Sequence, residues 1–140
     1  MKKAAVPFIV FILLFTFCAC SAGDKCDDLC RKVMKAVLAR DTAALDELTH
    51  PSHRGELDFG DGFYAELATF EITPGMELAS MSGPEIRYNE GDGYTLYFCN
   101  YVAVIEEMYY SVTACVLDNG EGFGLISLDI GFPEGLEGVI

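Results

Sequence analysis

The N-terminal half of the chain has apolar residues at the spacing of amphipathic helices. In the segment "DKCDDLCRKVMKAVLAR", Leu29, Val33 and Val37 fall on one helical face. The following segment, "DTAALDELTHP", restarts a short helix that ends before Pro51, because a residue before proline disfavours helical backbone. A third apolar face recurs in "DGFYAELATFEI". The sequence therefore predicts three helices, over residues 24–40, 41–50 and 61–72.

The C-terminal half changes to a period of two, which is typical of strands. The pattern predicts strands at 94–105, 109–118 and 126–130, and "DNGEG" has the turn residues of a hairpin. An earlier segment, 76–88, fits one or two strands interrupted at Pro84, since proline cannot occupy a central strand. Helices followed by an antiparallel meander predict an α+β fold with the N-terminal helices packed on one face of the sheet.

The hairpin of residues 94–118 has one register in which its apolar positions coincide. A three-residue connection at 106–108 sets Cys99 opposite Cys115, within reach of a cross-strand disulfide. A slip of one residue would set apolar against polar positions. The row expected to face the helices consists of Leu96, Phe98, Val102, Val104, Val112 and Val116.

The other two cysteines of the domain are Cys26 and Cys30. Their helical i, i+4 spacing is near the upper limit for a disulfide, and four thiols allow three pairings, so the connectivity stays open. Zinc is the rival interpretation of four cysteines, but neither pair has the usual ligand spacing. We therefore expect disulfides rather than a metal or another cofactor.

The first residues have the layout of an export signal. Lys2 and Lys3 precede an uncharged apolar run over residues 4–19. The letters "FCAC" at 17–20 resemble a bacterial lipoprotein box with Cys20 as the lipid-bearing residue. Cleavage after Ala22 to give a secreted protein, or an uncleaved anchor, are the alternatives. We expect a signal peptide at 1–19, a tether at 20–25, one α+β domain at 26–131 and a loose tail at 132–140.

The charge of the chain excludes one class of partner. Its formal net charge is −13, and no Lys or Arg follows Arg87, whereas nine acidic residues do. Such a surface repels phosphate backbones, so nucleic acid is not an expected partner. Membrane contact is expected through the lipid alone.

The order of elements resembles the nuclear transport factor 2-like superfamily, which includes ketosteroid isomerase and the SnoaL-like cyclases. The likeness covers about residues 26–130 and is carried by "VMKAVLARDTAALDELTHPS", a third helix and a long-stranded meander. It implies a curved, cone-like sheet around the first helix, a pocket in the cone mouth and dimerisation through the sheet. It does not imply catalysis, because one fold hosts many functions.

Candidate site residues fall into three groups. Tyr64, Asn100 and Tyr110 are candidates for a pocket lining. Tyr97, Tyr101 and Tyr109 alternate opposite the apolar row and are candidates for a partner surface or for ordinary exposed strand positions. His50 and His53 with Asp58 or Asp61 form a weak metal candidate, better explained as exposed loop residues.

No nucleophile elbow, P-loop or dinucleotide fingerprint is present in the sequence, and no catalytic residue is assigned. We expect a lipid-anchored, extracytoplasmic domain that binds a partner protein or a small apolar ligand, with a homodimer as one option. The alternative is a SnoaL-like isomerase, dehydratase or hydrolase that acts in the cone pocket. A filled interior favours the first hypothesis, and an open pocket with a carboxylate or histidine beside a tyrosine favours the second.

Overall fold

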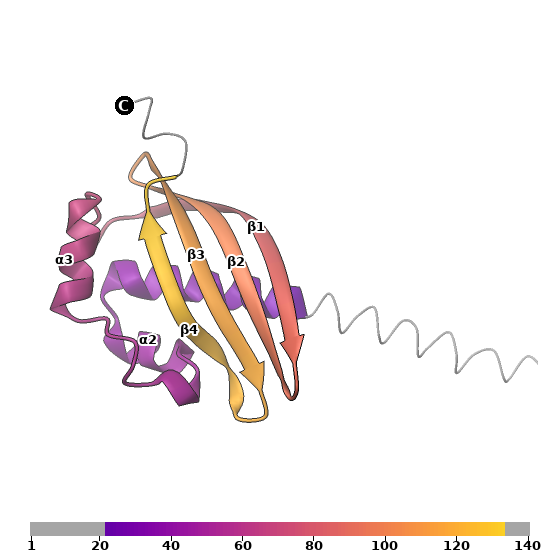
Figure 1. Ribbon diagram of the computed structural model, residues 1–140. Coiled ribbons are helices and arrows are strands. Elements are labelled where there is room, and N and C mark those ends of the chain that lie inside the picture. Colours follow the sequence, from indigo (N-terminus) through magenta and orange to yellow (C-terminus); the bar gives the residue numbers. More distant parts are fainter. Residues whose placement is uncertain (1–21, 134–140) are drawn as a thin grey trace, which may run out of the picture.

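A computed structural model describes residues 22–133 (Figure 1). The predicted signal peptide, the lipid anchor at Cys20 and residues 134–140 of the predicted tail lie outside the described residues. Residues 22–39 form the first helix, and the helices and strands after it are α2 (Thr42–Leu48), the 3-10 turn η1 (Pro51–His53), α3 (Asp61–Thr69), β1 (Leu78–Gly91), β2 (Tyr94–Ile105), β3 (Met108–Asn119) and β4 (Gly122–Gly131). In the described part of the chain, no helix is long and apolar enough to cross a membrane.

The four strands form one curved antiparallel sheet in the order β1-β2-β3-β4. The helix of residues 22–39 crosses behind this sheet in Figure 1. The predicted α+β fold, with N-terminal helices on one sheet face, is thus confirmed. We call the side of the sheet that contacts this helix the inner face and the opposite side the outer face.

The first helix packs on the sheet through the apolar residues that the sequence pattern predicts. Leu29, Val33 and Val37 are buried, with Val33 and Val37 fully inaccessible. The helix begins at residue 22, two residues before its predicted start, and so includes residues 22–25 of the predicted tether. It gives way to α2 at Asp41, whose side chain accepts a hydrogen bond from the Ala44 amide at 3.1 Å and caps the new helix.

The segment around Pro84 forms one long edge strand rather than two strands. β1 pairs only with β2, and the pairing shifts register between Ser82 and Glu85. Proline and an irregular register are tolerated at an edge because no second neighbour needs the missing amide donor.

The predicted register of the β2–β3 hairpin is wrong by one residue. The connection is a two-residue turn, Glu106 and Glu107, with Ile105 opposite Met108. Cys99 consequently pairs with Ala114, and Cys115 lies opposite Phe98. Because neighbours along a strand point to opposite sides, Cys99 and Cys115 lie on different faces and the predicted cross-strand disulfide does not form.

The assignment of the two β2 faces is also inverted relative to the expectation. The row against the helix contains Tyr97, Cys99, Tyr101, Ala103 and Ile105, and the last four of these are at most 3 % exposed. The outer row instead carries the residues that were expected to be buried. Phe98 and Val102, for example, are 40 % and 41 % exposed.

Candidate functional site

The outer face of the sheet carries a hollow of about 630 Å³. Its floor is a row of cross-strand neighbours, Asn100 of β2, Thr113 of β3 and Asp129 of β4. Val102 and Phe132 line its apolar side. Side chains along each strand point alternately to the two faces of the sheet. The pairing of the strands therefore brings these three residues together on one face, although they are far apart in sequence.

Some polar groups that line the hollow form hydrogen bonds or ion pairs with neighbouring side chains. The Thr113 hydroxyl donates to Asn100 Oδ1 at 3.0 Å. Glu85 lines the same hollow and pairs with Arg87 at 2.7 Å. Asp129 lines the same hollow and forms no ion pair within residues 22–133.

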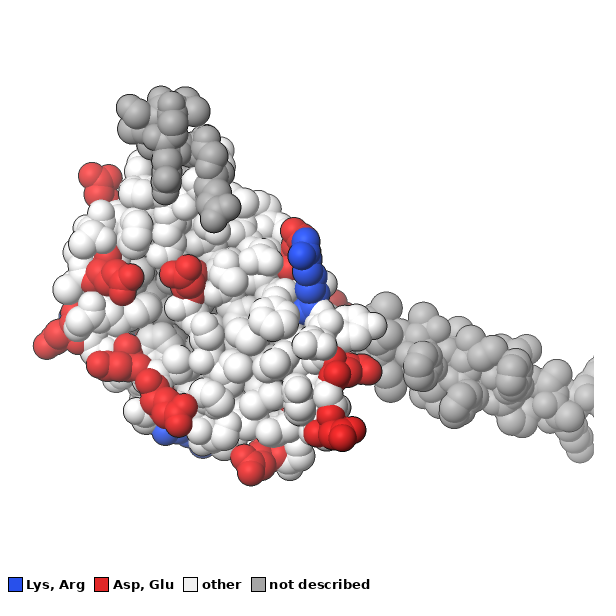
Figure 2. All heavy atoms as spheres, in the orientation of Figure 1, with Lys and Arg blue, Asp and Glu red and all other residues white. Residues whose placement is uncertain are grey.

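Exposed apolar side chains lie on the same outer face as the hollow. Phe98, Val102 and Tyr109 are 40 %, 41 % and 59 % exposed, and they come from the adjacent strands β2 and β3. Val104 lies directly opposite Tyr109 in the ladder and extends the same row. Figure 2 shows this face as a broad uncharged surface with acidic residues mainly along its margins.

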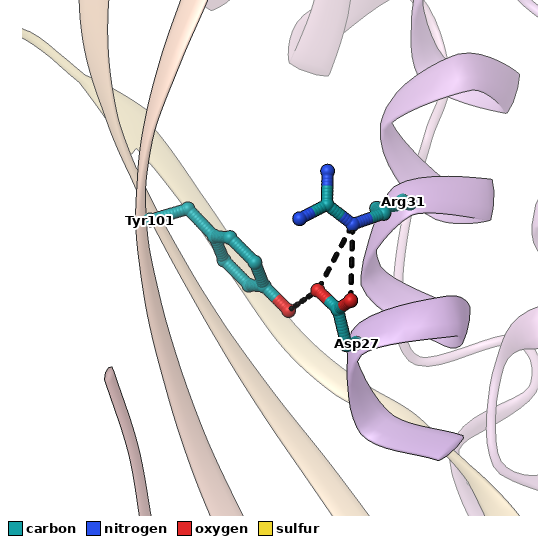
Figure 3. Close-up of polar contacts among 3 residues, drawn as sticks. All are labelled: Asp27, Arg31 and Tyr101. Atoms are coloured by element: carbon teal, nitrogen blue, oxygen red, sulfur yellow. Dashed lines mark hydrogen bonds and ion pairs between the residues drawn. The ribbon is translucent and has the colours of Figure 1, made fainter. Parts of the chain in front are cut away.

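A second polar cluster joins the first helix to the inner face (Figure 3). The Asp27 carboxylate accepts hydrogen bonds from Arg31 Nε at 3.0 and 3.1 Å and from the Tyr101 hydroxyl at 3.0 Å. The Arg31 guanidinium also lies 6.0 Å from the centre of the Tyr101 ring. Both donors converge on one carboxylate, so the cluster acts as a clamp between helix and strand.

Tyr101 remains protonated in this clamp. Burial raises the pKa of its hydroxyl well above the ordinary value, and the nearby Cys30 and the hydrogen bond to Asp27 raise it further. A protonated hydroxyl is the form that donates to the carboxylate, so the shift and the geometry agree. Tyr101 was predicted for an outward partner surface, but it is 3 % exposed and holds the helix in place.

The remaining tyrosine candidates also separate by face. Tyr97 is half-buried in the inner row, and only Tyr109 of the proposed partner surface lies on the outer face. Tyr64 and Tyr110, predicted for a pocket, are buried, and their hydroxyls donate to the carbonyls of Val37 and Phe70 at 2.9 and 2.7 Å. They therefore serve in packing.

Asn100 is the one pocket candidate that lines the hollow, on the outer face rather than in a cone mouth. The sequence analysis did not single out Thr113 and Asp129. The correct registers of the β2–β3 and β3–β4 pairs would have identified these two residues, because they align Thr113 and Asp129 with Asn100 in one row across the sheet.

His50 is a structural residue rather than an exposed loop residue. It is fully buried, its Nε2 lies 2.9 Å from Asn119 Oδ1, and its Nδ1 accepts from the Ser52 amide at 3.1 Å. These two bonds use both ring nitrogens. Its backbone passes so close to Gly124 that a Cβ at that position would collide with the His50 backbone nitrogen, which explains the glycine.

The other members of the metal candidate have other partners. His53 lies 3.8 Å from Glu56, and Asp61 pairs with Arg40 at 2.6 Å. Among residues 22–133, no group of three or more His, Cys, Asp or Glu side chains is arranged to hold a metal ion.

Comparison of the chain with known protein families, with curated proteins and with solved structures found no match.

The clamp predicts a stability change with a defined pH dependence. Tyr101→Phe removes the hydroxyl bond to a charged acceptor and should lower the free energy of unfolding at pH 7 by about 1–2 kcal/mol. In the wild type, the raised folded pKa of Tyr101 contributes fully to stability below the ordinary tyrosine value of 10.0. Above it, the unfolded chain ionises first, and stability falls by up to about 1.4 kcal/mol per pH unit for this group.

Urea unfolding between pH 7 and pH 11 measures both effects. Tyr101→Phe should lose this part of the alkaline slope, whereas the control Tyr109→Phe, at an exposed position, should match the wild type at every pH. Equal behaviour of the two variants would contradict the clamp.

Proposed function

We propose that this protein is an extracytoplasmic domain, tethered by a lipid on Cys20, that binds a partner protein through the outer face of its sheet. The observation that carries the proposal is the row of exposed apolar side chains on that face. Within the described part of the chain, no helix packs over this row (Figure 1). Contiguous exposed apolar surface on a small domain commonly marks an interaction site.

The filled interior supports binding at the surface rather than inside the domain. The space between the first helix and the sheet holds the side chains of Val33, Val37, Met34, Val112 and Val116, each at most 1 % exposed. Tight packing of this kind is the usual state of a protein core. The hollow on the outer face is instead open to a partner's side chains.

The charge of the domain favours a basic partner. The chain has a formal net charge of −13, and Asp129 stands in the hollow without an ion pair among residues 22–133. A second copy would bring two acidic margins together, which is unfavourable. A partner with an apolar centre and lysine or arginine around it would complement both the exposed row and the margins.

The hollow also bears on the choice between a protein and a small apolar ligand. Asn100, Thr113 and Asp129 make its floor polar, so an apolar molecule would remove water from the Asp129 carboxylate and supply no hydrogen bond in return. A lysine or arginine side chain of a partner would donate to Asp129 and to the Asn100 oxygen. This supports the protein partner.

The relation to the nuclear transport factor 2-like superfamily remains part of the proposal. It is supported by the element order, in which a long helix, two shorter helices and an antiparallel meander follow one another. Many binding domains use a sheet face in this way, but fold likeness alone does not assign a partner.

Site-specific photo-crosslinking in the producing cell tests the partner surface. A benzoylphenylalanine at position 102 should give one discrete hetero-adduct, whereas the same group at the exposed helix position Lys35 should give none. Phe98→Asp should reduce the adduct at least tenfold. Ala65→Asp, which adds the same charge on the exposed side of α3, should leave it unchanged.

Raising the salt concentration should weaken the adduct, because the proposed attraction is partly between charges. Equal labelling from positions 102 and 35 would contradict the surface. An adduct of twice the monomer mass would identify a homodimer instead.

Lipid attachment has its own test. Mass spectrometry of the membrane fraction should find a chain that begins at Cys20 and carries acyl groups. Cys20→Ala should move the protein out of the membrane fraction, whereas Cys18→Ala should not. If Cys20→Ala stays equally membrane-bound, the tether is an uncleaved anchor.

A further inference from the structure

Three cysteines converge between the first helix and the inner face. Cys26 and Cys30 are one helical turn apart on the buried side of the helix, and Cys99 lies in the buried inner row of β2 that this helix covers. Their exposed fractions are 0 %, 1 % and 0 %. We call these residues the thiol cluster. Cys115, the fourth cysteine of the domain, lies in the outer row and does not belong to it.

Cys99 is the centre of the thiol cluster. Two residues along β2 from Cys99, the Tyr101 hydroxyl donates to Asp27 of the helix at 3.0 Å, which brings the buried helical turn of Cys26 and Cys30 over this part of the strand. Cys26 and Cys30 are also the two thiols that most affect the pKa of Cys99. This arrangement places two alternative bonding partners beside one sulfur. All three are free thiols in the structure.

Helix geometry decides which pairs can bond. In a regular helix, Cβ atoms at i and i+4 are about 5–6 Å apart, whereas a disulfide needs about 3.5–4.5 Å. A bond between Cys26 and Cys30 would therefore require the helix to unwind. A bond from Cys99 to either of them joins two packed elements and leaves the helix wound.

We infer that Cys99 forms a disulfide with Cys26 or Cys30, and that the third thiol of the cluster exchanges the bond between the two pairings. Formation transfers two electrons and two protons from two thiols to a disulfide oxidant such as oxidised glutathione, which becomes two thiols. In the exchange, the third thiolate attacks the Cys99 sulfur, the existing S–S bond breaks, and the displaced cysteine leaves as a thiolate that takes up a proton.

The surroundings of the thiols set the conditions for this chemistry. The neighbouring Cys26 thiol and then burial raise the pKa of Cys99 to about 12, against a lowering effect of Cys30, and the pKa of Cys30 is also raised, first by Cys99 and then by burial. The thiolates of Cys99 and Cys30 are therefore scarce at neutral pH in the folded domain, and exchange should be slow. Oxidation should be fastest during folding, before the helix covers the sulfurs.

The cellular supply of oxidant rests on the proposed export, but the pairing itself does not. The test is therefore made with the purified full-length protein, reduced, unfolded and refolded in a buffer of reduced and oxidised glutathione, then alkylated and digested. Trypsin cannot separate Cys99 from Cys115, because no Lys or Arg follows Arg87. Chymotrypsin cleaves at Tyr101 and separates them.

The wild type should give a peptide that joins Cys99 to the segment of Cys26 and Cys30. Cys26→Ser and Cys30→Ser should each keep a bond to Cys99, since either partner suffices, and the control Cys115→Ser should match the wild type. Cys99→Ser should form no bond within the domain. Oxidation should raise the Tm of the wild type by about 10 °C or more and leave that of Cys99→Ser unchanged.

A bond between Cys99 and Cys115, a bond between Cys26 and Cys30 in the wild type, or complete alkylation of the four thiols of the domain would overturn the inference. If Cys99→Ser does not fold, the two helix variants still decide the question, because loss of the bond in both would exclude Cys99 as the shared partner. Failure here leaves the proposed outer-face partner untouched, since that surface contains none of the three thiols.

Discussion

The two-residue turn at Glu106 and Glu107 determines which side chains of the hairpin face the helix. Both residues have positive φ, 48° and 73°, a conformation that costs a non-glycine residue about 1 kcal/mol or more. Glu106 is held there by Glu77, whose carbonyl accepts from the Glu106 amide at 3.3 Å and whose own amide donates to the Glu106 carboxylate at 3.1 Å. With a turn of this length, Cys99 and Tyr101 point inward. A turn longer by one residue would invert one strand relative to the other.

The elements of the fold and the buried sides of the first helix and β3 could be predicted from the sequence, but the facing of β2 could not. Helical spacing in "VMKAVLAR" and alternation through β2 and β3 are strong local signals, and the α+β class follows from their order. Both alternating rows of side chains in β2 are largely apolar, however. The sequence pattern alone therefore did not decide whether Phe98 and Val102 or Cys99 and Tyr101 are buried in the core. The turn has neither Asn nor Gly, the usual indicators of a two-residue hairpin. The hollow depends on that register, so it could not be foreseen either.

The orientation gives the two faces of the sheet different physical roles. The inner face joins the helix through the hydrogen bonds of the Asp27 clamp and through the thiol cluster, where we infer a covalent bond in oxidising conditions, because a small domain has limited apolar area to bury. The outer face keeps Phe98 and Val102 exposed, and its hollow holds the Asp129 carboxylate, which has no ion pair among residues 22–133. The domain is thus stabilised from one side, and the other side is the one proposed to bind a partner.

Oxidative footprinting by hydroxyl radicals, read residue by residue with mass spectrometry, tests the orientation of the sheet most directly. Phe98 and Tyr101 are aromatic residues of the same strand, and Tyr109 and Tyr110 are neighbours in the next one. The account predicts rapid modification of Phe98 and Tyr109, which are 40 % and 59 % exposed, and protection of Tyr101 and Tyr110, which are 3 % and 1 % exposed. Modification of Tyr101 at the rate of Phe98, or protection of Phe98, would contradict the assignment of the two faces.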